Sequence, residues 1–171
     1  MREIGFFGGG SICSLGPVSD VVLFFGCVDS FVVKKDKTQD WNLITDRLYR
    51  RYLKREELDS AKKLIEEIQI IFSKIPSGSI EWNEKVLDKQ KTMLNPELGV
   101  LSDIFNKYFD SFFHCVEAAK LSYESFKDYP NYKYEPVRIG ISNIPHFMLD
   151  KRRQLSDYDS LSDNDKPFWL R

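Results

Sequence analysis

The sequence predicts a helix-rich α+β fold in a single domain, in which a small sheet of short strands packs against several amphipathic helices. Two long stretches, 58–75 and 104–123, repeat apolar residues at steps of three and four, as one buried face of a helix requires. Two short stretches, 4–7 and 137–142, are rich in Ile, Val and Phe and have the length of strands. A chain of 171 residues can build one core without disulfides or metal.

The N-terminal part of the chain predicts two short strands and a buried helix. The strand segments, 4–7 and 11–15, lie on either side of three consecutive glycines, Gly8–Gly10. We interpret these glycines as a place where the chain leaves a strand on its way to a helix, because glycine relaxes backbone sterics at bends. A helix is then expected from a cap at Ser19 or Asp20 to residue 32.

The central part predicts two helices and a strand. The first helix, 43–55, would turn its apolar residues inward and its arginines outward. The second, 58–75, has a clear helical period and ends at Pro76 and Gly78. The alternating run 79–82 is expected to form a short strand.

The C-terminal part predicts the main core helix and a charged extension. The helix begins at Ser102, and its many aromatic residues make it the expected spine of the core. We divide the chain into a globular α+β domain, 1–145, and a charged C-terminal extension, 146–171, which is rich in Ser and Asp. The extension ends in Pro-Phe-Trp-Leu, 167–170, which is expected to dock either on its own domain or on a partner.

The glycine-rich opening lacks the residues of a nucleotide-binding loop. Gly5 and Gly10 have the spacing of a Walker motif, but Ser11 and Ile12 stand where its lysine and hydroxyl residue belong. A dinucleotide fingerprint fails as well, since Cys13 takes the place of its third glycine. A small cytosolic phosphate- or nucleotide-binding enzyme that uses this loop is therefore the alternative function, not the favoured one.

The composition favours a binding protein over an enzyme. Of the two histidines, His114 is adjacent to Cys115 on a helix, where neighbours diverge, so the two do not form a nucleophile and base pair. Three separated cysteines fit reduced thiols, and we expect no metal and no cofactor. A net charge of −1 gives no basic footprint for direct nucleic-acid binding. With no membrane-length apolar run and no secretory signal, we expect a cytoplasmic protein.

Two charged segments are candidates for binding a macromolecular partner. The extension carries four aspartates within nine residues, a row that would imitate phosphates toward a partner with a basic cleft. The predicted helix 43–55 carries arginines whose guanidinium groups could hold phosphate or carboxylate. The predicted contact residues are Asp157, Asp159, Asp163, Asp165 and Trp169, with Arg50, Arg51 and Arg55 as a second patch.

The order of the segments resembles that of immunity proteins from bacterial polymorphic toxin and contact-dependent growth inhibition systems. In that group a glycine-containing opening precedes an aromatic-rich helix, a helix of acidic and apolar residues ends at a proline, and a short strand carries a tryptophan, here Trp82. A late helix opens Leu-Ser-x-x-Phe, here Leu101, Ser102 and Phe105. The resemblance covers about residues 10–120.

The resemblance implies a cytoplasmic antidote that binds and neutralises the C-terminal toxin domain of a large exported effector. In such systems the toxin is often a basic nuclease that acts on tRNA or other RNA. The antidote would cover the toxin's active site or block a host factor in the same complex. The expected partner is therefore a cognate toxin domain, with no direct contact to nucleic acid and none to a membrane. A regulatory adaptor for some other protein stays open as a further alternative.

Overall fold

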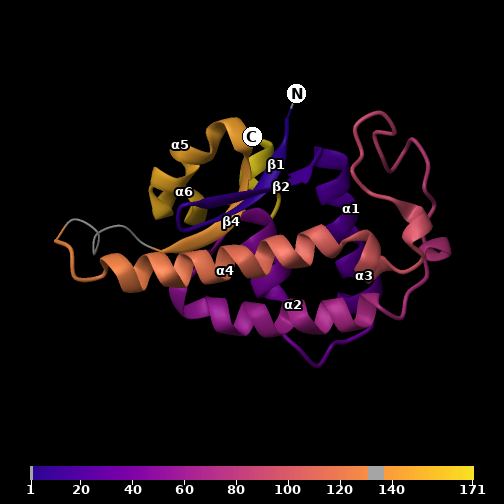
Figure 1. Cartoon of the computed structure of the whole chain (residues 1–171), viewed down its shortest axis with the longest axis horizontal. Helices are drawn as coiled ribbons and strands as arrows, with labels where there is room; N and C mark the ends of the chain where they lie inside the picture. The colour runs from indigo at the N-terminus through magenta and orange to yellow at the C-terminus, as the bar shows by residue number, and fades with distance from the viewer. Residues whose placement is uncertain (1, 131–136) are drawn as a thin grey trace.

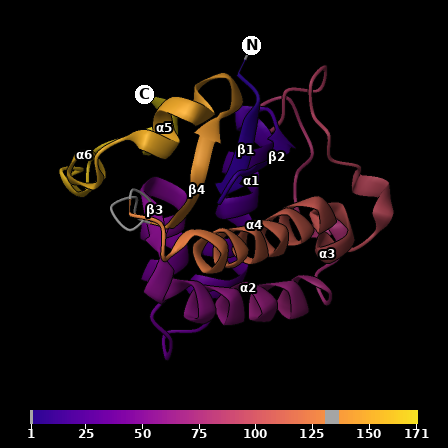
Figure 2. The ribbon, with the colours of Figure 1, turned by 60° about the vertical axis from the view of Figure 1, so that its left-hand side comes forward.

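A four-stranded antiparallel sheet with helical layers on both faces forms the centre of the molecule (Figures 1 and 2). This computed structural model describes residues 2–130 and 137–171. Three helices lie on one face of the sheet: α1 (Val18–Val28), α2 (Leu58–Phe72) and α4 (Asn106–Phe126). The C-terminal segment lies on the other face, with α5 (Phe147–Arg152) and α6 (Leu155–Asp159). The predicted α+β class, with a small sheet and several helices in one domain, is confirmed.

The sheet has the strand order β2-β1-β4-β3, and each neighbouring pair is antiparallel. Phe6 of β1 lies opposite Ile141 of β4, and both side chains belong to the core on the α4 side. The strands predicted around the glycines and near residue 140 are confirmed. Their bounds are β1 Ile4–Gly8, β2 Ser11–Gly16, β3 Tyr52–Lys54 and β4 Arg138–Asn143.

The glycine cluster forms the tight turn of the β1–β2 hairpin and rests on the α4 backbone. Gly9 has a φ of 57°, a left-handed value that suits the mirror-image turns of two-residue hairpins. A Cβ on Gly8 would lie 2.5 Å from the carbonyl oxygen of Cys115, and one on Gly9 would lie 2.6 Å from that of Ala118. The glycines therefore end one strand and begin the next. The prediction that they lead from a strand into a helix is wrong, because the chain first returns as β2 and enters a helix only after Gly16 and Pro17.

The main core lies between the sheet and the helices α1, α2, α3 and α4. The ring of Phe24 on α1 contacts the rings of Phe72, Phe105 and Tyr108 at centroid distances of 4.7 to 5.9 Å. The α2 and α4 helices confirm two predictions, although Phe105, at φ −99° and ψ 17°, separates a short α3 from α4. The helix bounds are α1 Val18–Val28, α2 Leu58–Phe72, α3 Leu101–Ile104 and α4 Asn106–Phe126.

The C-terminal segment covers the other face of the sheet. It forms α5, Phe147–Arg152, α6, Leu155–Asp159, and a final turn, Phe168–Leu170. The ring of Phe147 lies 6.0 Å from that of Phe7 on β1. At the end of the chain, Trp169 is buried and its indole nitrogen donates a hydrogen bond to the carbonyl of Tyr49. The apolar end therefore docks on its own domain, which resolves one of the alternatives left by the sequence.

Two secondary-structure predictions are wrong. The helix expected over 43–55 ends early: a π-helical turn, Leu43–Leu48, is followed by the edge strand β3. Tyr52 and Leu53 are both fully buried, and a strand directs such neighbours to opposite faces of a sheet, which a helix does not. Residues 79–82 form no strand, and Trp82 instead donates a hydrogen bond of 2.8 Å from its indole nitrogen to the carbonyl of Ser77.

Candidate partner-binding site

Two arginines fix the acidic segment 157–165 by its backbone. Arg50 and Arg51 lie between the π-helical turn and β3, and both guanidinium groups point toward the C-terminal segment. Arg50 donates hydrogen bonds to two carbonyl oxygens of this segment and Arg51 to three, and together we call these contacts the arginine clamp. The acceptors and distances are Ser162 at 2.6 Å, Asp165 at 2.9 Å, Tyr158 at 3.0 Å, Asp159 at 3.3 Å and Leu161 at 2.7 Å.

The arginines of the clamp are part of the interior and do not form an outward patch. Their side chains are 14% and 11% exposed, and the carboxylate of Asp46 pairs with Arg50 at 2.9 Å and with Arg51 at 3.4 Å. Asp46 thus orients both guanidinium groups toward the carbonyls that they hold. The prediction that Arg50 and Arg51 point outward is wrong, because the chain turns into a strand at this point and brings them under the C-terminal segment.

The four aspartates of the segment remain on the surface. Because the clamp uses backbone carbonyls, it leaves the carboxylates free to face solvent. Asp159 lies 3.7 Å from Arg47, and Asp165 lies 3.2 Å from Arg171. A hydrogen bond from the backbone N–H of Ser162 lowers the pKa of Asp165, with help from Arg171. Asp157 and Asp163 are exposed, and no described side chain forms an ion pair with them.

Trp169 and Arg55 occupy places that the sequence did not reveal. Trp169 is only 4% exposed, and its indole nitrogen donates a hydrogen bond of 2.7 Å to the carbonyl of Tyr49. It anchors the end of the chain and offers no surface to a partner. The guanidinium of Arg55 lies 3.6 Å from the ring centre of Tyr123 on α4, away from the clamp. The three predicted arginines therefore do not form one patch.

A buried polar network supports the acidic segment from below. The carboxylate of Asp150 is 6% exposed, accepts a hydrogen bond from Ser142 on β4 and pairs with Arg153 at 3.1 Å. The hydroxyl of Tyr158 donates to the Asp150 carbonyl at 3.1 Å, and burial raises the pKa of Tyr158 to about 12. Sequence reasoning missed this network, since nothing in the local pattern around Asp150 distinguishes a buried carboxylate from a solvated one.

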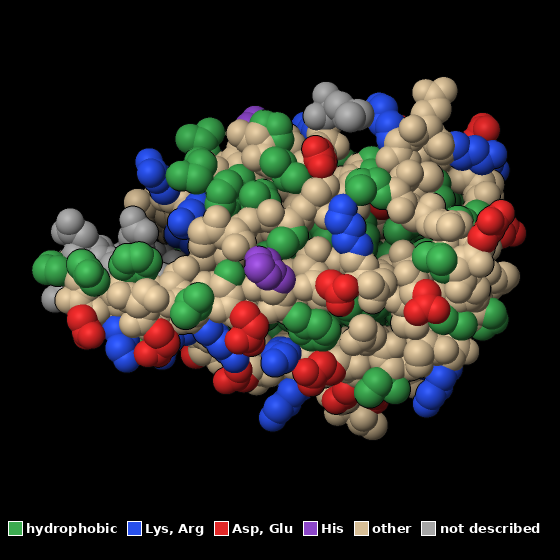
Figure 3. All heavy atoms as spheres, in the orientation of Figure 1, with side chains coloured by type: hydrophobic (Ala, Val, Ile, Leu, Met, Phe, Trp, Pro, Cys, Tyr) green, Lys and Arg blue, Asp and Glu red, His purple; other side chains and the backbone are tan. Residues whose placement is uncertain are grey.

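Acidic side chains also lie along the outer face of α4, where basic side chains alternate with them (Figure 3). Glu117 pairs with Lys62 of α2 at 3.8 Å, and Glu124 pairs with Lys127 at 2.8 Å. This helical face therefore has compensated charges, which contrasts with the less compensated row over 157–165.

The chemistry of the described residues adds two findings. Among residues 2–130 and 137–171, no three side chains of His, Cys, Asp or Glu gather as a metal site would need. None of the helices in that part of the chain has the length and apolar character that crossing a bilayer demands. In comparisons with known proteins, no family model, curated protein or solved structure matches this chain.

Proposed function

We propose that this chain is an immunity protein that binds and neutralises a basic cognate toxin domain, and that the acidic segment 157–165 is its contact surface. The observation that carries the proposal is the arginine clamp, which holds the backbone of the segment and leaves its carboxylates outward. A nuclease cleft is basic because it binds phosphates, so a fixed row of carboxylates is complementary to it. The proposal agrees with the resemblance described above.

Rigid presentation of the carboxylates favours tight binding. Ordering a mobile segment on association costs free energy, and a segment that is already fixed avoids this cost. The segment is held at both ends, by the clamp at residues 158–165 and by buried Trp169 beyond it. A stable complex needs a total interface of about 1,600 Å², so neighbouring surface must contribute to it as well.

Within the segment, Asp157 and Asp163 are the residues that we assign to partner contact. Arg47 and Arg171 partly neutralise Asp159 and Asp165, whereas Asp157 and Asp163 keep their full charge toward solvent. Arg50, Arg51 and Trp169 then act as supports of the surface. This arrangement favours covering of the toxin's active cleft over blocking of a host factor.

The test is binding to the C-terminal toxin domain encoded by the gene immediately upstream. The double variant Asp157→Lys, Asp163→Lys should fold normally, because neither carboxylate has a described partner. We expect it to associate with the toxin domain about ten-fold or more slowly at low salt, since like charges then oppose a basic cleft. Stopped-flow or surface plasmon resonance measurements at several salt concentrations would give the association rates.

The matched control is Glu66→Lys, Asp110→Lys, which makes the same charge change on exposed positions of α2 and α4. It should associate like the wild type apart from a small general charge effect. Equal slowing of both double variants would refute the assignment to 157–165. Absence of any complex between the wild-type chain and the toxin domain, together with unrelieved toxicity on co-expression, would refute the proposed function itself.

A further inference from the structure

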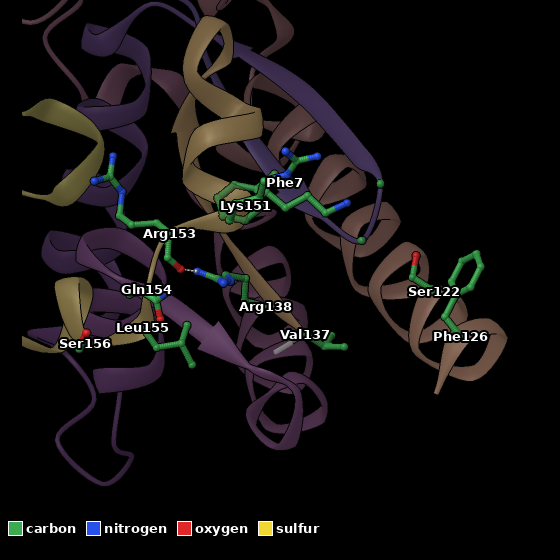
Figure 4. A pocket seen from close by; sticks show the side chains of 13 residues that line it. Phe7, Ser122, Phe126, Val137, Arg138, Lys151, Arg153, Gln154, Leu155 and Ser156 are labelled. Carbon is green, nitrogen blue, oxygen red and sulfur yellow. Dashed lines mark hydrogen bonds between the residues drawn. The ribbon is translucent and has the colours of Figure 1, made fainter. Parts of the chain in front are cut away.

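A cavity of about 670 Å³ opens between the two layers that flank the sheet (Figure 4). Its walls are the tip of the β1–β2 hairpin at Gly9 and Gly10, the end of α4, the start of β4 and the segment that joins α5 to α6. This volume lies within the range of small-molecule sites, which is roughly 300–1,000 Å³. The cavity thus has room for a ligand of the size of a mononucleotide.

The wall of this cavity is strongly cationic. Four of its residues are Arg138, Lys151, Arg152 and Arg153, and none of the described residues that line it is acidic. Arg153 is neutralised by Asp150, and its guanidinium points away from the cavity (Figure 4). The other three cations form no ion pair with any described side chain. In a chain with a net charge of −1, such a gathering of unpaired positive charge indicates attraction for an anion.

Arg138 is the strongest sign of a missing anionic partner. It lies on the central strand β4 and is only 6% exposed. One of its terminal nitrogens donates a hydrogen bond of 2.7 Å to the carbonyl of Arg153, while its Nε has no hydrogen-bond partner among the described residues. Its guanidinium also lies 5.8 Å from the ring centre of Tyr158. These contacts replace only part of the lost hydration, and a buried guanidinium without a carboxylate remains costly. An anion in the cavity would offset this cost.

Apolar side chains form part of the remaining wall, beside the polar residues Ser122, Gln154 and Ser156, and they suit an organic group beside the anion. Figure 4 shows Lys151 reaching across Phe7 into the cavity, with Ser122 on the opposite wall. Val137 and Leu155 add aliphatic surface. At the hairpin tip, a Cβ on Gly10 would contact nothing within 4 Å, so the backbone leaves open space on this side.

We propose that this cavity binds a small phosphate monoester that carries an apolar or aromatic group. The phosphate would lie between Arg138, Lys151 and Arg152, since guanidinium groups hold phosphate through paired, charge-assisted hydrogen bonds. The organic group would pack on Phe7, Val137 and Leu155. This site does not depend on the proposed toxin binding, and its glycines form part of the wall without acting as a phosphate loop.

Calorimetry with defined probes tests the site. The probes are adenosine monophosphate and phenyl phosphate, with adenosine and phenol as their respective neutral counterparts and inorganic phosphate as the purely ionic one. We expect saturable binding of at least one monoester, and binding of its two counterparts to be weaker by about ten-fold or more, because each lacks half of the contacts. Bound monoester should also raise the unfolding temperature of the full chain.

Two sets of variants locate the site. Lys151→Gln, Arg152→Gln should weaken monoester binding by about ten-fold or more, since each lost cation removes charge-assisted hydrogen bonds. Lys35→Gln, Lys37→Gln, an equal charge change at exposed positions outside the cavity, should leave binding unchanged. Arg138→Met should abolish binding, and if it fails to fold, the Lys151 and Arg152 variant decides.

Three outcomes would overturn the proposal. The first is that neither monoester binds at millimolar concentration. The second is an equal loss of binding in the cavity variant and in the Lys35 and Lys37 control. The third is that a short single-stranded RNA binds while both monoesters do not, which would assign the cationic wall to a nucleic acid.

Discussion

At the scale of single residues, Asp20 connects a long loop to the core. It lies in the first turn of α1, and its side chain is fully buried. One carboxylate oxygen accepts a hydrogen bond of 2.8 Å from the backbone N–H of Met93, while the other has no described partner. Burial raises the pKa of Asp20, and its charge contributes, after burial, to the raised pKa of Tyr108. Ionisation of this carboxylate therefore reduces the stability of the fold.

This raised pKa predicts how Asp20→Asn changes the pH dependence of stability. Because the folded state binds this proton more tightly than the unfolded state, Asp20 lowers the free energy of unfolding as pH rises above its ordinary pKa of 3.8. The asparagine variant keeps an acceptor for the backbone N–H of Met93, and its stability does not fall in this way as the pH rises. We expect the variant to gain stability relative to the wild type between about pH 4 and pH 7.

Urea unfolding at several pH values measures this difference. Asp110→Asn, at an exposed position of α4, is the control and should follow the wild-type curve closely. Wild-type and Asp20→Asn curves that stay parallel across this pH range would contradict the prediction.

Some single residues could be assigned from the sequence, and others could not. The glycine cluster was recognised as a backbone feature, but its reason is the approach of Gly8 and Gly9 to carbonyls of α4, more than one hundred residues away in the chain. The aspartates of 157–165 were predicted to be exposed, and they are. Trp169 is predicted as a partner contact and is buried, because it packs on Tyr49, a contact between residues 120 positions apart that no local pattern indicates.

At the scale of elements, the segment between Leu48 and Tyr52 determines where the C-terminal region lies. The chain leaves a π-helical turn and enters β3 within four residues, which directs Arg50 and Arg51 across the sheet edge. The long helices α2 and α4 could be predicted because many turns repeat the same apolar face. A strand of three residues gives no such repeat, so β3 is visible only through its pairing with β4.

The clamp predicts a local loss of stability in Arg51→Ala. This side chain is 11% exposed, donates to three backbone carbonyls and pairs with Asp46. Its removal leaves the carbonyls of Tyr158, Asp159 and Leu161 without this donor, while Asp46 keeps its ion pair with Arg50. We expect the free energy of unfolding to fall by about 2–4 kcal/mol. Amide hydrogen exchange should increase most over residues 158–165, and denaturant unfolding gives the global change.

Arg55→Ala is the comparison for this prediction. Arg55 is exposed and stacks on Tyr123, an interaction worth about 0.5–1 kcal/mol at such sites. Loss of the Arg55 side chain should leave amide hydrogen exchange over residues 158–165 unchanged. If both alanine variants lost the same stability and exchanged alike, the clamp would not be what holds the segment.

At the scale of the whole molecule, one sheet packs against two layers, and the sequence patterns of these two layers differ strongly. The layer of α1, α2 and α4 has regular apolar periodicity and was predicted. The layer formed by residues 144–171 is polar in composition, and only a few apolar side chains, such as Tyr158 and Leu161, cover the sheet. The composition of this region predicts a separate extension. In the structure, contacts with residues far away in the chain join it to the sheet.

This arrangement predicts that a chain ending at Pro145 does not keep the native fold. Tyr158, Leu161 and Trp169 are each at most 4% exposed, and burial of such a side chain contributes about 1.5–3 kcal/mol. Their joint loss is comparable with the whole stability of a typical domain, which is about 5–15 kcal/mol. Truncation would also expose Phe7 and the clamp arginines. We expect loss of near-ultraviolet circular dichroism and of a cooperative unfolding transition in the truncated chain.

A full-length variant separates the two properties of the C-terminal region. Changing Asp157, Asp159, Asp163 and Asp165 to Asn removes the charge of the region and keeps its apolar contacts. That variant should unfold cooperatively near the wild-type midpoint, because the carboxylates are exposed and the clamp binds backbone carbonyls. A truncated chain that unfolds at the wild-type midpoint would show that the second layer is dispensable. If instead the asparagine variant lost the fold while the truncated chain kept it, the contribution of the C-terminal region to stability would come from its charge and not from its apolar burial.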